Sequence, residues 1–354
     1  RLQLGPPIPG DPWVGPPTAA RLLAEVSPGS TLFWGAMAIE YRMAEYDDFD
    51  VERVVEIARA IRPDDYESVA DLSDWHRAQR RAGRMCVRWL ALIDGRVMGS
   101  AYVGQSSWVP ITTMMLYAAV HPDHQGRGHG RALLERAENT AGERGGERTF
   151  SWTEETWPRS MQFLDRAGYG AVERRWESTL DLSRCDPGIL QDAVDRMDSS
   201  GIRIVSVASL SAERADWKSD LHRLYSDVEK DVPAPFPIQE VPFEDFEALS
   251  LGRRFVAEGF FVALDGDELV GLTEPQLVDD VPDAIEQNLT GVRSDYRGRG
   301  IAFALKSQAA IWAAHAGYTS IRTQNAESNA AMLAVNDRLG FNRDRATIEY
   351  LKDL

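Results

Sequence analysis

The chain has 354 residues, more than one hydrophobic core usually serves, so its length favours two domains. A formal net charge of −16 disfavours a protein whose main task is to bind nucleic acid, and no apolar run approaches the ~18 residues that would indicate a membrane span. The two cysteines, Cys86 and Cys185, are far apart and form no CxxC pair, so we expect a cytoplasmic protein without disulfides or metal ligands.

The first 36 residues differ from the rest of the chain. RLQLGPPIPGDPWVGPP is rich in proline and has neither helical nor strand periodicity. It also lacks the basic start and long apolar core of a signal peptide. We therefore predict that residues 1–36 form a non-native or disordered N-terminal extension without a chemical role.

From residue 38 the chain follows one order of elements. An amphipathic helix (49–61) precedes a strand, an Asp-Gly turn and a second strand, the pattern of a β-hairpin. The apolar strand TTMMLYAAV then runs into VHPDHQGRGHG (120–130), followed by an alanine- and leucine-rich helix. A short strand and a last helix, closed by Ala-Gly-Tyr, complete the unit.

The second half of the chain repeats this order. VRSDYRGRGIA (292–302) matches the first glycine turn at an offset of 172, and Gly168 and Gly340 differ by the same number. Repeats at a fixed offset indicate duplicated structural units. We predict a domain at 38–182, a linker at 183–202 and a domain at 203–354. Strands followed by helices predict an α/β fold with a mixed sheet in each domain.

Each glycine turn lies between a strand and the start of a helix. Glycine allows positive φ and close approach of a ligand to the backbone, and the first turn of a helix presents unpaired N–H groups. Together these features favour a bound phosphate. The turns are neither a Walker A loop, since no GK[ST] follows, nor the dinucleotide fingerprint, since Arg131 stands where its third glycine would be.

The pattern Val-x-x-x-x-Gln/Arg-Gly-x-Gly-x-Gly/Ala between strand and helix resembles the acyl-CoA signature of the GCN5-related N-acetyltransferases (GNAT). The order of elements and the Leu-Gly-Phe ending are similar too, so the resemblance covers most of 38–354 as two tandem GNAT domains. It implies that acetyl-CoA is the co-substrate, with its pyrophosphate on the turn amides and its thioester carbonyl near the valine that precedes each turn. The implied cofactor-binding residues are Val120, Gln125, Gly126, Arg127, Gly128, His129 and Gly130 in the first domain, and Val292, Arg297, Gly298, Arg299, Gly300, Ile301 and Ala302 in the second.

The two halves differ after the signature helix. The resemblance implies that Asn325 and Asn329 of the second half bind the pantetheine arm or phosphates, whereas the first half has Thr153 and Trp157 there. Family members often place a tyrosine, the general acid for the departing thiolate, at the positions that hold Asn336 and Leu164 here. We therefore favour catalysis in the second half, with Asn336 at the position of the acid and either water or another group protonating the thiolate.

An ammonium acceptor must lose a proton before it attacks the thioester. Glu286 in AIEQNLTGV alternates with Asn288, Thr290 and Val292, so we expect it to share the face of Val292 and to act as the base. Glu274 in LTEPQ is a second candidate, and a surface glutamate without a catalytic role is the alternative for both.

These observations predict an acetyl-CoA-dependent N-acetyltransferase that acts on a primary amine of a small molecule by direct attack on the thioester. The expected partner is that small molecule, with no nucleic acid and no membrane, and the chain would be a monomer or a homodimer. Two alternatives stay open: a CoA-binding sensor or scaffold without turnover, and an acyltransferase that uses a different acyl-CoA.

Overall fold

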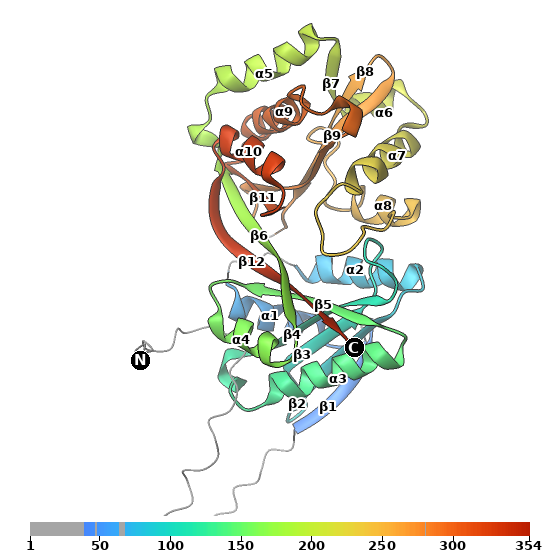
Figure 1. The fold of residues 1–354 in the computed structure, drawn as a ribbon, viewed down its shortest axis with the longest axis vertical. Coiled ribbons are helices and arrows are strands. Elements are labelled where there is room, and N and C mark those ends of the chain that lie inside the picture. The colour runs from blue at the N-terminus through green and yellow to red at the C-terminus, as the bar shows by residue number, and fades with distance from the viewer. Residues whose placement is uncertain (1–38, 47, 64–67, 280) are drawn as a thin grey trace, which may run out of the picture. The chain divides into compact units, whose positions relative to one another are not determined.

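The computed structural model describes residues 39–46, 48–63, 68–279 and 281–354. The predicted extension at 1–36 lies outside these residues. The chain divides into two compact units (Figure 1). Unit 1 holds the described residues up to Ser106 together with Ile111–Ala171 and Tyr350–Leu354, and unit 2 holds Ser107–Pro110 and Val172–Glu349. None of the described helices is long and apolar enough to cross a membrane.

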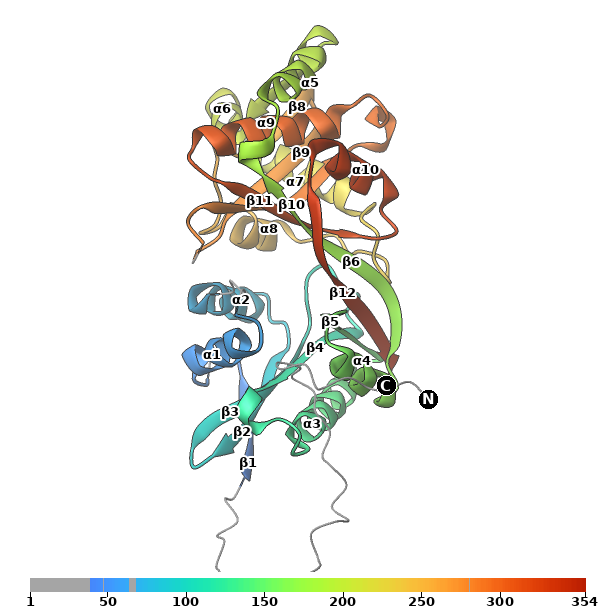
Figure 2. The ribbon, with the colours of Figure 1, turned by 90° about the vertical axis from the view of Figure 1, so that its left-hand side faces the viewer.

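Unit 1 is a twisted sheet with helices on both faces. Strands β1 to β5 lie in chain order, and β12 lies beside β5. The pairs β1–β2, β2–β3 and β3–β4 are antiparallel, and β4–β5 is parallel. Helices α1 and α2 cover one face, and α3 and α4 cover the other (Figure 2). The elements are β1 (Ile39–Glu45), α1 (Val51–Ile61), α2 (Val69–Arg81), β2 (Cys86–Ile93), β3 (Arg96–Gly104), β4 (Thr113–Val120), α3 (His129–Glu143), β5 (Arg148–Glu154) and α4 (Pro158–Arg166).

Unit 2 repeats this plan. Its strands lie in the order β12-β6-β11-β10-β9-β8-β7, and β10 runs parallel to β11 as β4 does to β5. Its elements are β6 (Gly170–Asp181), α5 (Pro187–Ser199), β7 (Ile202–Ser206), α6 (Val207–Glu213), α7 (Trp217–Glu229), α8 (Phe243–Leu249), β8 (Phe261–Asp265), β9 (Glu268–Leu277), β10 (Ala284–Val292), α9 (Ile301–His315), β11 (Ser320–Ala326), α10 (Ala330–Leu339) and β12 (Asn342–Asp353). The predicted mixed α/β fold is confirmed.

The predicted hairpins are confirmed in both units. Strands β2 and β3 pair antiparallel across Asp94 and Gly95, which have φ of 50° and 76°. Strands β8 and β9 pair in the same way across Gly266, with φ of 57°. Positive φ at the turn matches the right-handed twist of the flanking strands, which is why Asp and Gly are favoured there.

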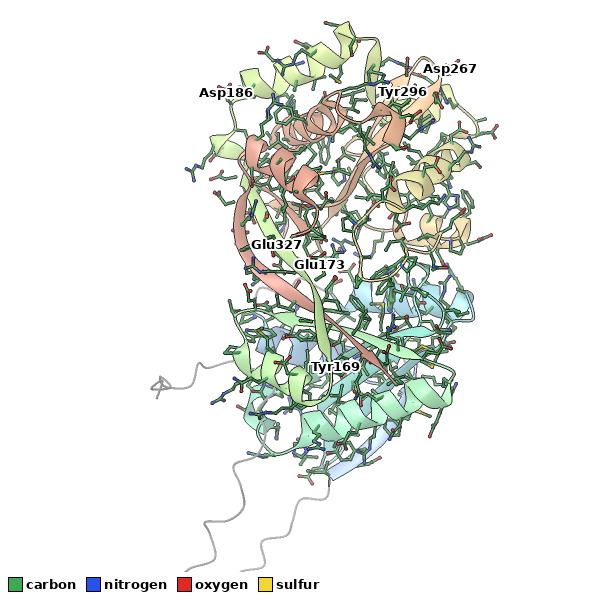
Figure 3. The ribbon with its side chains drawn as sticks, in the orientation of Figure 1. Tyr169, Glu173, Asp186, Asp267, Tyr296 and Glu327 are labelled. Atoms are coloured by element: carbon green, nitrogen blue, oxygen red, sulfur yellow. The ribbon has the colours of Figure 1, made fainter. Side chains whose placement is uncertain are left out.

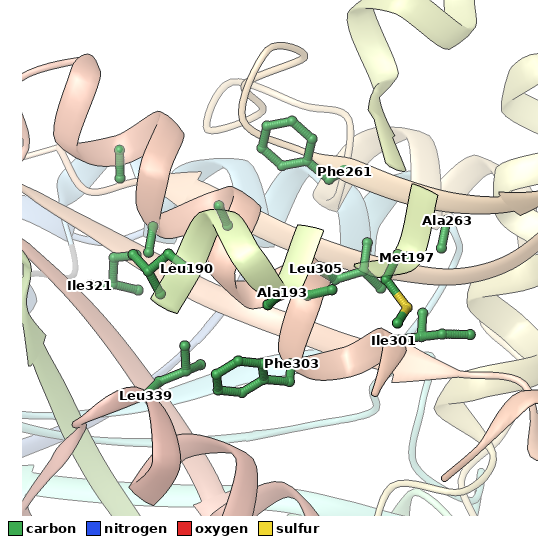
Figure 4. Close-up of a cluster of buried hydrophobic side chains, with 14 of the residues drawn as sticks. Leu190, Ala193, Met197, Phe261, Ala263, Ile301, Phe303, Leu305, Ile321 and Leu339 are labelled. Atoms are coloured by element: carbon green, nitrogen blue, oxygen red, sulfur yellow. The ribbon is translucent and has the colours of Figure 1, made fainter. Parts of the chain in front are cut away.

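Helix α5, which the sequence predicts as a short linker helix, is part of the core of unit 2. Leu190, Ala193 and Met197 of α5 are buried and pack against α9, as Figure 4 shows. The facing residues of α9 include Ile301 and Phe303. A helix with a continuous apolar face gains most of its stability from such packing, so α5 is a structural part of unit 2.

The last strand of each sequence half is shared between the two units. Apart from its first two residues β6 belongs to unit 2, where it pairs with β11 from Ala326 to Ser320. The end of β12, from Tyr350, belongs to unit 1. The predicted ranges 38–182 and 203–354 follow the order of elements along the chain, and they stay a prediction for the limits of the two family domains.

Candidate functional site

The two glycine turns have the same backbone geometry. Gly128 immediately precedes α3 with φ 86° and ψ −3°, and Gly300 precedes α9 with φ 85° and ψ 6°. Gly126 and Gly298 also have positive φ, of 73° and 77°. A Cβ at Gly128 or Gly298 would meet no atom within 4 Å. The turns therefore need glycine for their conformation, and the absent side chains leave the space above the first helical amides open.

The side chains of Gln125 and Arg297 fold back onto the preceding strand. Gln125 Nε2 donates to the carbonyl of Val120 at 3.0 Å, and Arg297 Nε donates to the carbonyl of Val292 at 3.0 Å. Each side chain thus links the start of the turn to the end of the strand. Two different residue types make the same contact, and their backbone amides donate within the turn, to the carbonyls of Pro122 and Ser294. This position therefore fixes the turn.

A cavity of about 690 Å³ opens at the turn of unit 1. All the predicted cofactor-binding residues of this half except Arg127 line it. Its cationic side chains are Arg131, Arg159, Arg166 and Lys352. Glu135 and Glu138 also line it and pair with Arg131 at 2.7 Å and Lys352 at 2.9 Å. Open amides at the start of a long helix, with guanidinium groups nearby, suit a phosphate-bearing ligand.

His129 begins α3 and lines the same cavity. Its Nδ1 lies 3.2 Å from the hydroxyl of Tyr41, and its side chain is buried. Burial lowers the pKa of His129, and the nearby Arg127 lowers it further. The imidazole is therefore neutral near pH 7, and it would meet a ligand as a hydrogen-bonding group without charge.

The corresponding space in unit 2 is more closely filled. The Met197 Cε of α5 lies 3.9 Å from where a Cβ on Gly300 would be. Phe303, which takes the place of Arg131 at the offset of 172, is buried, and the guanidinium of Arg338 lies 3.9 Å from its ring centroid. Ile301 is buried as well, while Arg299 stays exposed and lies over the ring of Tyr296 at 4.6 Å. Tyr296 is labelled in Figure 3. The two turns therefore share a backbone geometry and differ in the side chains around them.

Strand β10 has a bulge that β4 lacks. Gln287 pairs with Pro275 and Thr290 with Thr273, so β10 has one more residue than β9 between these pairs. Strand β4 pairs with β3 without interruption from Met115 to Val120. A bulge leaves backbone groups outside the regular ladder and is common next to active sites.

The bulge reverses the expected orientation of Glu286. Glu286 pairs with Gln276, and Val292 pairs with Gly271, five residues away along β9. Side chains alternate along a strand, so an odd spacing places Glu286 and Val292 on opposite faces. The expectation of a shared face is therefore wrong, because the extra residue in β10 shifts the alternation. Glu286 also forms an ion pair with Arg254, with 2.5 Å between Nη2 and Oε2; its catalytic role stays a prediction.

Glu274, the second candidate from the sequence, lies next to the bulge and is fully buried. Its carboxylate accepts hydrogen bonds from Gln276 Nε2 at 2.8 Å and from Asn288 Nδ2 at 3.0 Å, and also from Ser250 and the Leu289 amide. Burial nevertheless raises the pKa of Glu274 to about 7. A carboxyl group that titrates near neutral pH has the basicity that a general base requires.

Glu229 is a titratable neighbour of Glu274 that sequence reasoning missed. It ends α7, its Oε2 is buried without a hydrogen-bond partner, and burial together with the charge of Glu274 raises its pKa to about 7. Nothing in the amphipathic pattern of α7 marks Glu229, because its burial depends on packing against strands more than forty residues away. The two glutamates disfavour each other's ionisation.

The asparagines of the second half come together in part. Asn336 is buried on α10, and its Nδ2 donates to Asn325 Oδ1 on β11 at 2.7 Å, whereas its own Oδ1 is buried without a partner. Asn329 caps α10, with its side chain accepting from the Met332 amide at 3.2 Å. An amide oxygen accepts and cannot donate a proton, so Asn336 does not replace a tyrosine as an acid through that atom.

Each of the two glycine turns joins the first strand of a parallel pair to the helix that follows it. Two such turns in one chain define a tandem acyl-CoA acyltransferase. The chain belongs to the acetyltransferase (GNAT) family, whose model matches residues 51–169 and again 221–341. The resemblance drawn from the glycine turns is confirmed, and the protein is an acetyltransferase. Among the described residues no group of three or more His, Cys, Asp or Glu side chains is arranged to hold a metal ion.

The chain is similar to several known proteins over most of its length. It is 26% identical over 328 residues to a protein named mycothiol acetyltransferase from Nocardiopsis dassonvillei, covering 83% of this chain and 92% of the relative. A second protein of that name, from Geodermatophilus obscurus, is 26% identical over 65% of this chain and 71% of its own length. Among solved structures, a tandem GNAT protein from the clavulanic acid biosynthesis pathway has a TM-score of 0.67 at 20% identity, covering 89% of this chain and 98% of its own. This last likeness supports the tandem fold.

Proposed function

We propose that the protein transfers an acetyl group from acetyl-CoA to a primary amine of a small molecule, and that unit 2 carries out the transfer. The observation that carries this assignment is the bulge in β10 with the buried carboxylate of Glu274 against it. Unit 1 has neither feature. Strand β4 pairs regularly with β3, and the residue of unit 1 that corresponds to Glu274 at the offset of 172 is Tyr102. A half that lacks the bulge and the carboxylate lacks the groups that the reaction needs.

In the proposed reaction the acceptor ammonium first gives a proton to a carboxylate. Glu274 is the favoured base because its pKa is about 7, and Glu286 remains the alternative. The amine nitrogen then attacks the thioester carbonyl carbon, the carbonyl oxygen gains negative charge, and a backbone N–H near Val292 stabilises it. The C–N bond forms, the carbonyl re-forms as the C–S bond breaks, and the nitrogen gives its second proton to water. The CoA thiolate leaves and takes up a proton from water, so that the products are the amide and the free thiol.

In unit 2, by this proposal, the pyrophosphate is held by the amides of Gly298, Arg299, Gly300, Ile301 and Ala302. Arg297, whose own amide donates to the carbonyl of Ser294 at 3.4 Å, holds the turn in place. Asn325 lies at the end of β11, close to the pantetheine arm that the proposal places between β10 and β11. The cap formed by Asn329 fixes the start of α10 on the other side of that arm. The described residues of unit 2 suit a phosphate-bearing thioester. Open amides at the start of α9 suit its phosphates, and the buried carboxyl group of Glu274 suits the base that the reaction requires.

Unit 1 supports a second function, the binding of acyl-CoA without turnover. Its cavity is open and lined by four cationic side chains. Leu164 is buried where unit 2 has Asn336, so neither an acid nor an amide faces the thiolate there. This second function of unit 1 is that of a CoA sensor or scaffold, the alternative to catalysis.

Thiol release measured with a panel of primary amines tests the assignment. The first acceptor to assay is that of the mycothiol acetyltransferases, because the chain shares most of its length with proteins of that name. Gly300→Val should abolish turnover, whereas the matched Gly128→Val should retain it, since φ near +85° excludes a β-branched residue at both positions. Loss of turnover in Gly128→Val but not in Gly300→Val would assign catalysis to unit 1. Binding of CoA without thiol release for any amine would favour the sensor.

We also propose a cytoplasmic location. Cys86 and Cys185 are both free thiols. Unpaired cysteines are stable in a reducing compartment.

A further inference from the structure

Lys306 is a buried cation without an anionic partner. It lies on α9, only 2% of its surface is exposed, and its Nζ makes no hydrogen bond or ion pair with the described residues. Its polar contact is with the ring of Phe341, whose centroid is 4.9 Å from Nζ. A cation–π contact offsets only part of the cost of removing an ammonium group from water.

The position of Lys306 on α9 corresponds to a cavity-lining position in unit 1. Helices α3 and α9 begin at His129 and Ile301, which differ by 172, and the same offset relates Lys306 to Leu134. Leu134 lines the cavity at the glycine turn of unit 1 and is almost fully buried. A leucine therefore satisfies the packing at this position, so packing alone does not account for a lysine in unit 2.

The side chain of Lys306 is long enough to extend toward the glycine turn at the start of α9. Lys306 is five residues after Ile301, which corresponds to about 7.5 Å along the helix axis. Side chains on a helix tilt toward its N-terminus, and lysine has a flexible four-carbon stem. The ammonium can therefore approach the first turn of α9, where open amides already favour an anion.

Desolvation alone lowers the pKa of Lys306, to about 7, and no charged neighbour contributes to this change. The charged group that α10 brings to this side of α9 is Arg338, which lies over Phe303 and has the same sign. In the free protein the amine is thus close to half protonated at pH 7. A phosphate close to it would favour the ammonium form.

We propose that Lys306 is an anion-binding residue of unit 2 that pairs with a phosphate group of acyl-CoA held at the start of α9. The proposal rests on the proposed binding of acyl-CoA by unit 2. Nζ takes up a proton from solvent as the phosphate binds, and no covalent bond changes. The cleft of unit 1, with Leu134 at this position, uses the arginines on its rim instead.

Calorimetric titration of the full chain tests this role. The background variant is Gly128→Val, which blocks the turn of unit 1 so that binding by unit 2 is measured alone. Lys306→Met is then introduced into this background, because methionine is neutral and similar in length to lysine. Lys218→Met, which removes an exposed lysine on α7 from its ion pair with Glu247, serves as the matched control. The probes are CoA, dephospho-CoA and pantetheine, which carry all, some and none of the phosphates.

We expect Lys306→Met to weaken CoA binding about tenfold or more, as for a lost charge-assisted hydrogen bond, and to leave pantetheine binding unchanged. Titrations at pH 8 in two buffers of different ionisation enthalpy should show proton uptake in the parent and in Lys218→Met, but not in Lys306→Met. A loss for CoA that is absent for dephospho-CoA identifies the 3′-phosphate as the partner; a loss for both identifies the pyrophosphate.

Equal CoA affinity in Lys306→Met and its parent would overturn the role of Lys306 and leave the proposed function standing. An equal loss for CoA and pantetheine would also overturn it, because the effect would not depend on phosphate. Absence of CoA binding by unit 2 would overturn this role together with the proposed function. Should Gly128→Val fail to fold, titrations of Lys306→Met in the wild-type background, analysed for two sites, give the same comparison.

Discussion

Lys306→Met should stabilise the protein, and the gain should depend on pH. Burial lowers the pKa of Lys306 from 10.5 to about 7. This difference of about 3.5, at about 1.36 kcal/mol for each pKa unit, corresponds to about 5 kcal/mol of unfolding free energy. Loss of the contact with Phe341 removes up to ~2 kcal/mol of this gain. We therefore expect a net gain of about 3 kcal/mol when the lysine is fully charged.

The sign of the pH dependence follows from the lowered pKa. Between about pH 7 and 10.5 the unfolded chain binds more protons at Lys306 than the folded chain. The unfolding free energy of the wild type should therefore rise with pH across this window. Urea unfolding of the wild type and of Lys306→Met at pH 6, 8 and 10 measures the difference, which should be largest at pH 6 and smallest at pH 10. Lys218→Met is the surface control, and a difference that stays constant with pH would refute the reasoning.

Three further predictions concern the clefts and their support. Glu274→Gln should lower turnover about a hundredfold or more and remove the rate increase around pH 7 on the acid limb of the pH–rate profile, since the pKa of Glu274 is about 7; an unchanged profile would exclude this base. Gly128→Val should reduce the number of CoA molecules bound per chain by one. Gly142→Ala is the control and should leave this number unchanged, because a Cβ at Gly142 would meet no atom within 4 Å. Equal numbers of bound CoA in the two variants would show that CoA does not bind at the turn of unit 1. Gly291→Ala would bring a Cβ to 2.5 Å from Val228 Cβ and should destabilise unit 2 by about 1–3 kcal/mol relative to Gly142→Ala, measured by thermal unfolding; equal stability would show that α7 shifts without cost.

The sequence predicted those features that depend on neighbouring residues. The Asp-Gly hairpins, the two glycine turns and the helices that follow them are set by local backbone preferences, and the structure has all of them. The duplicated order of elements also predicted the mixed sheet, because strand and helix periods differ clearly in this chain.

The sequence did not reveal the features that depend on contacts between distant segments. The bulge in β10 arises from its register against β9, and it reversed the orientation expected for Glu286. The raised pKa values of Glu229 and Glu274 arise from their joint burial, which no local pattern records. The burial of Lys306 is likewise not evident from the sequence of α9, because it depends on the segments that pack around that helix.

The allocation of β12 to two units has a consequence for the order of assembly during synthesis. Lys352, which lines the cavity of unit 1, lies in the segment Tyr350–Leu354. The ribosome reaches this segment only after it has made every residue of unit 2. A nascent chain therefore has no finished cavity in unit 1 until these residues emerge, although the other residues that line this cavity are made before most of unit 2.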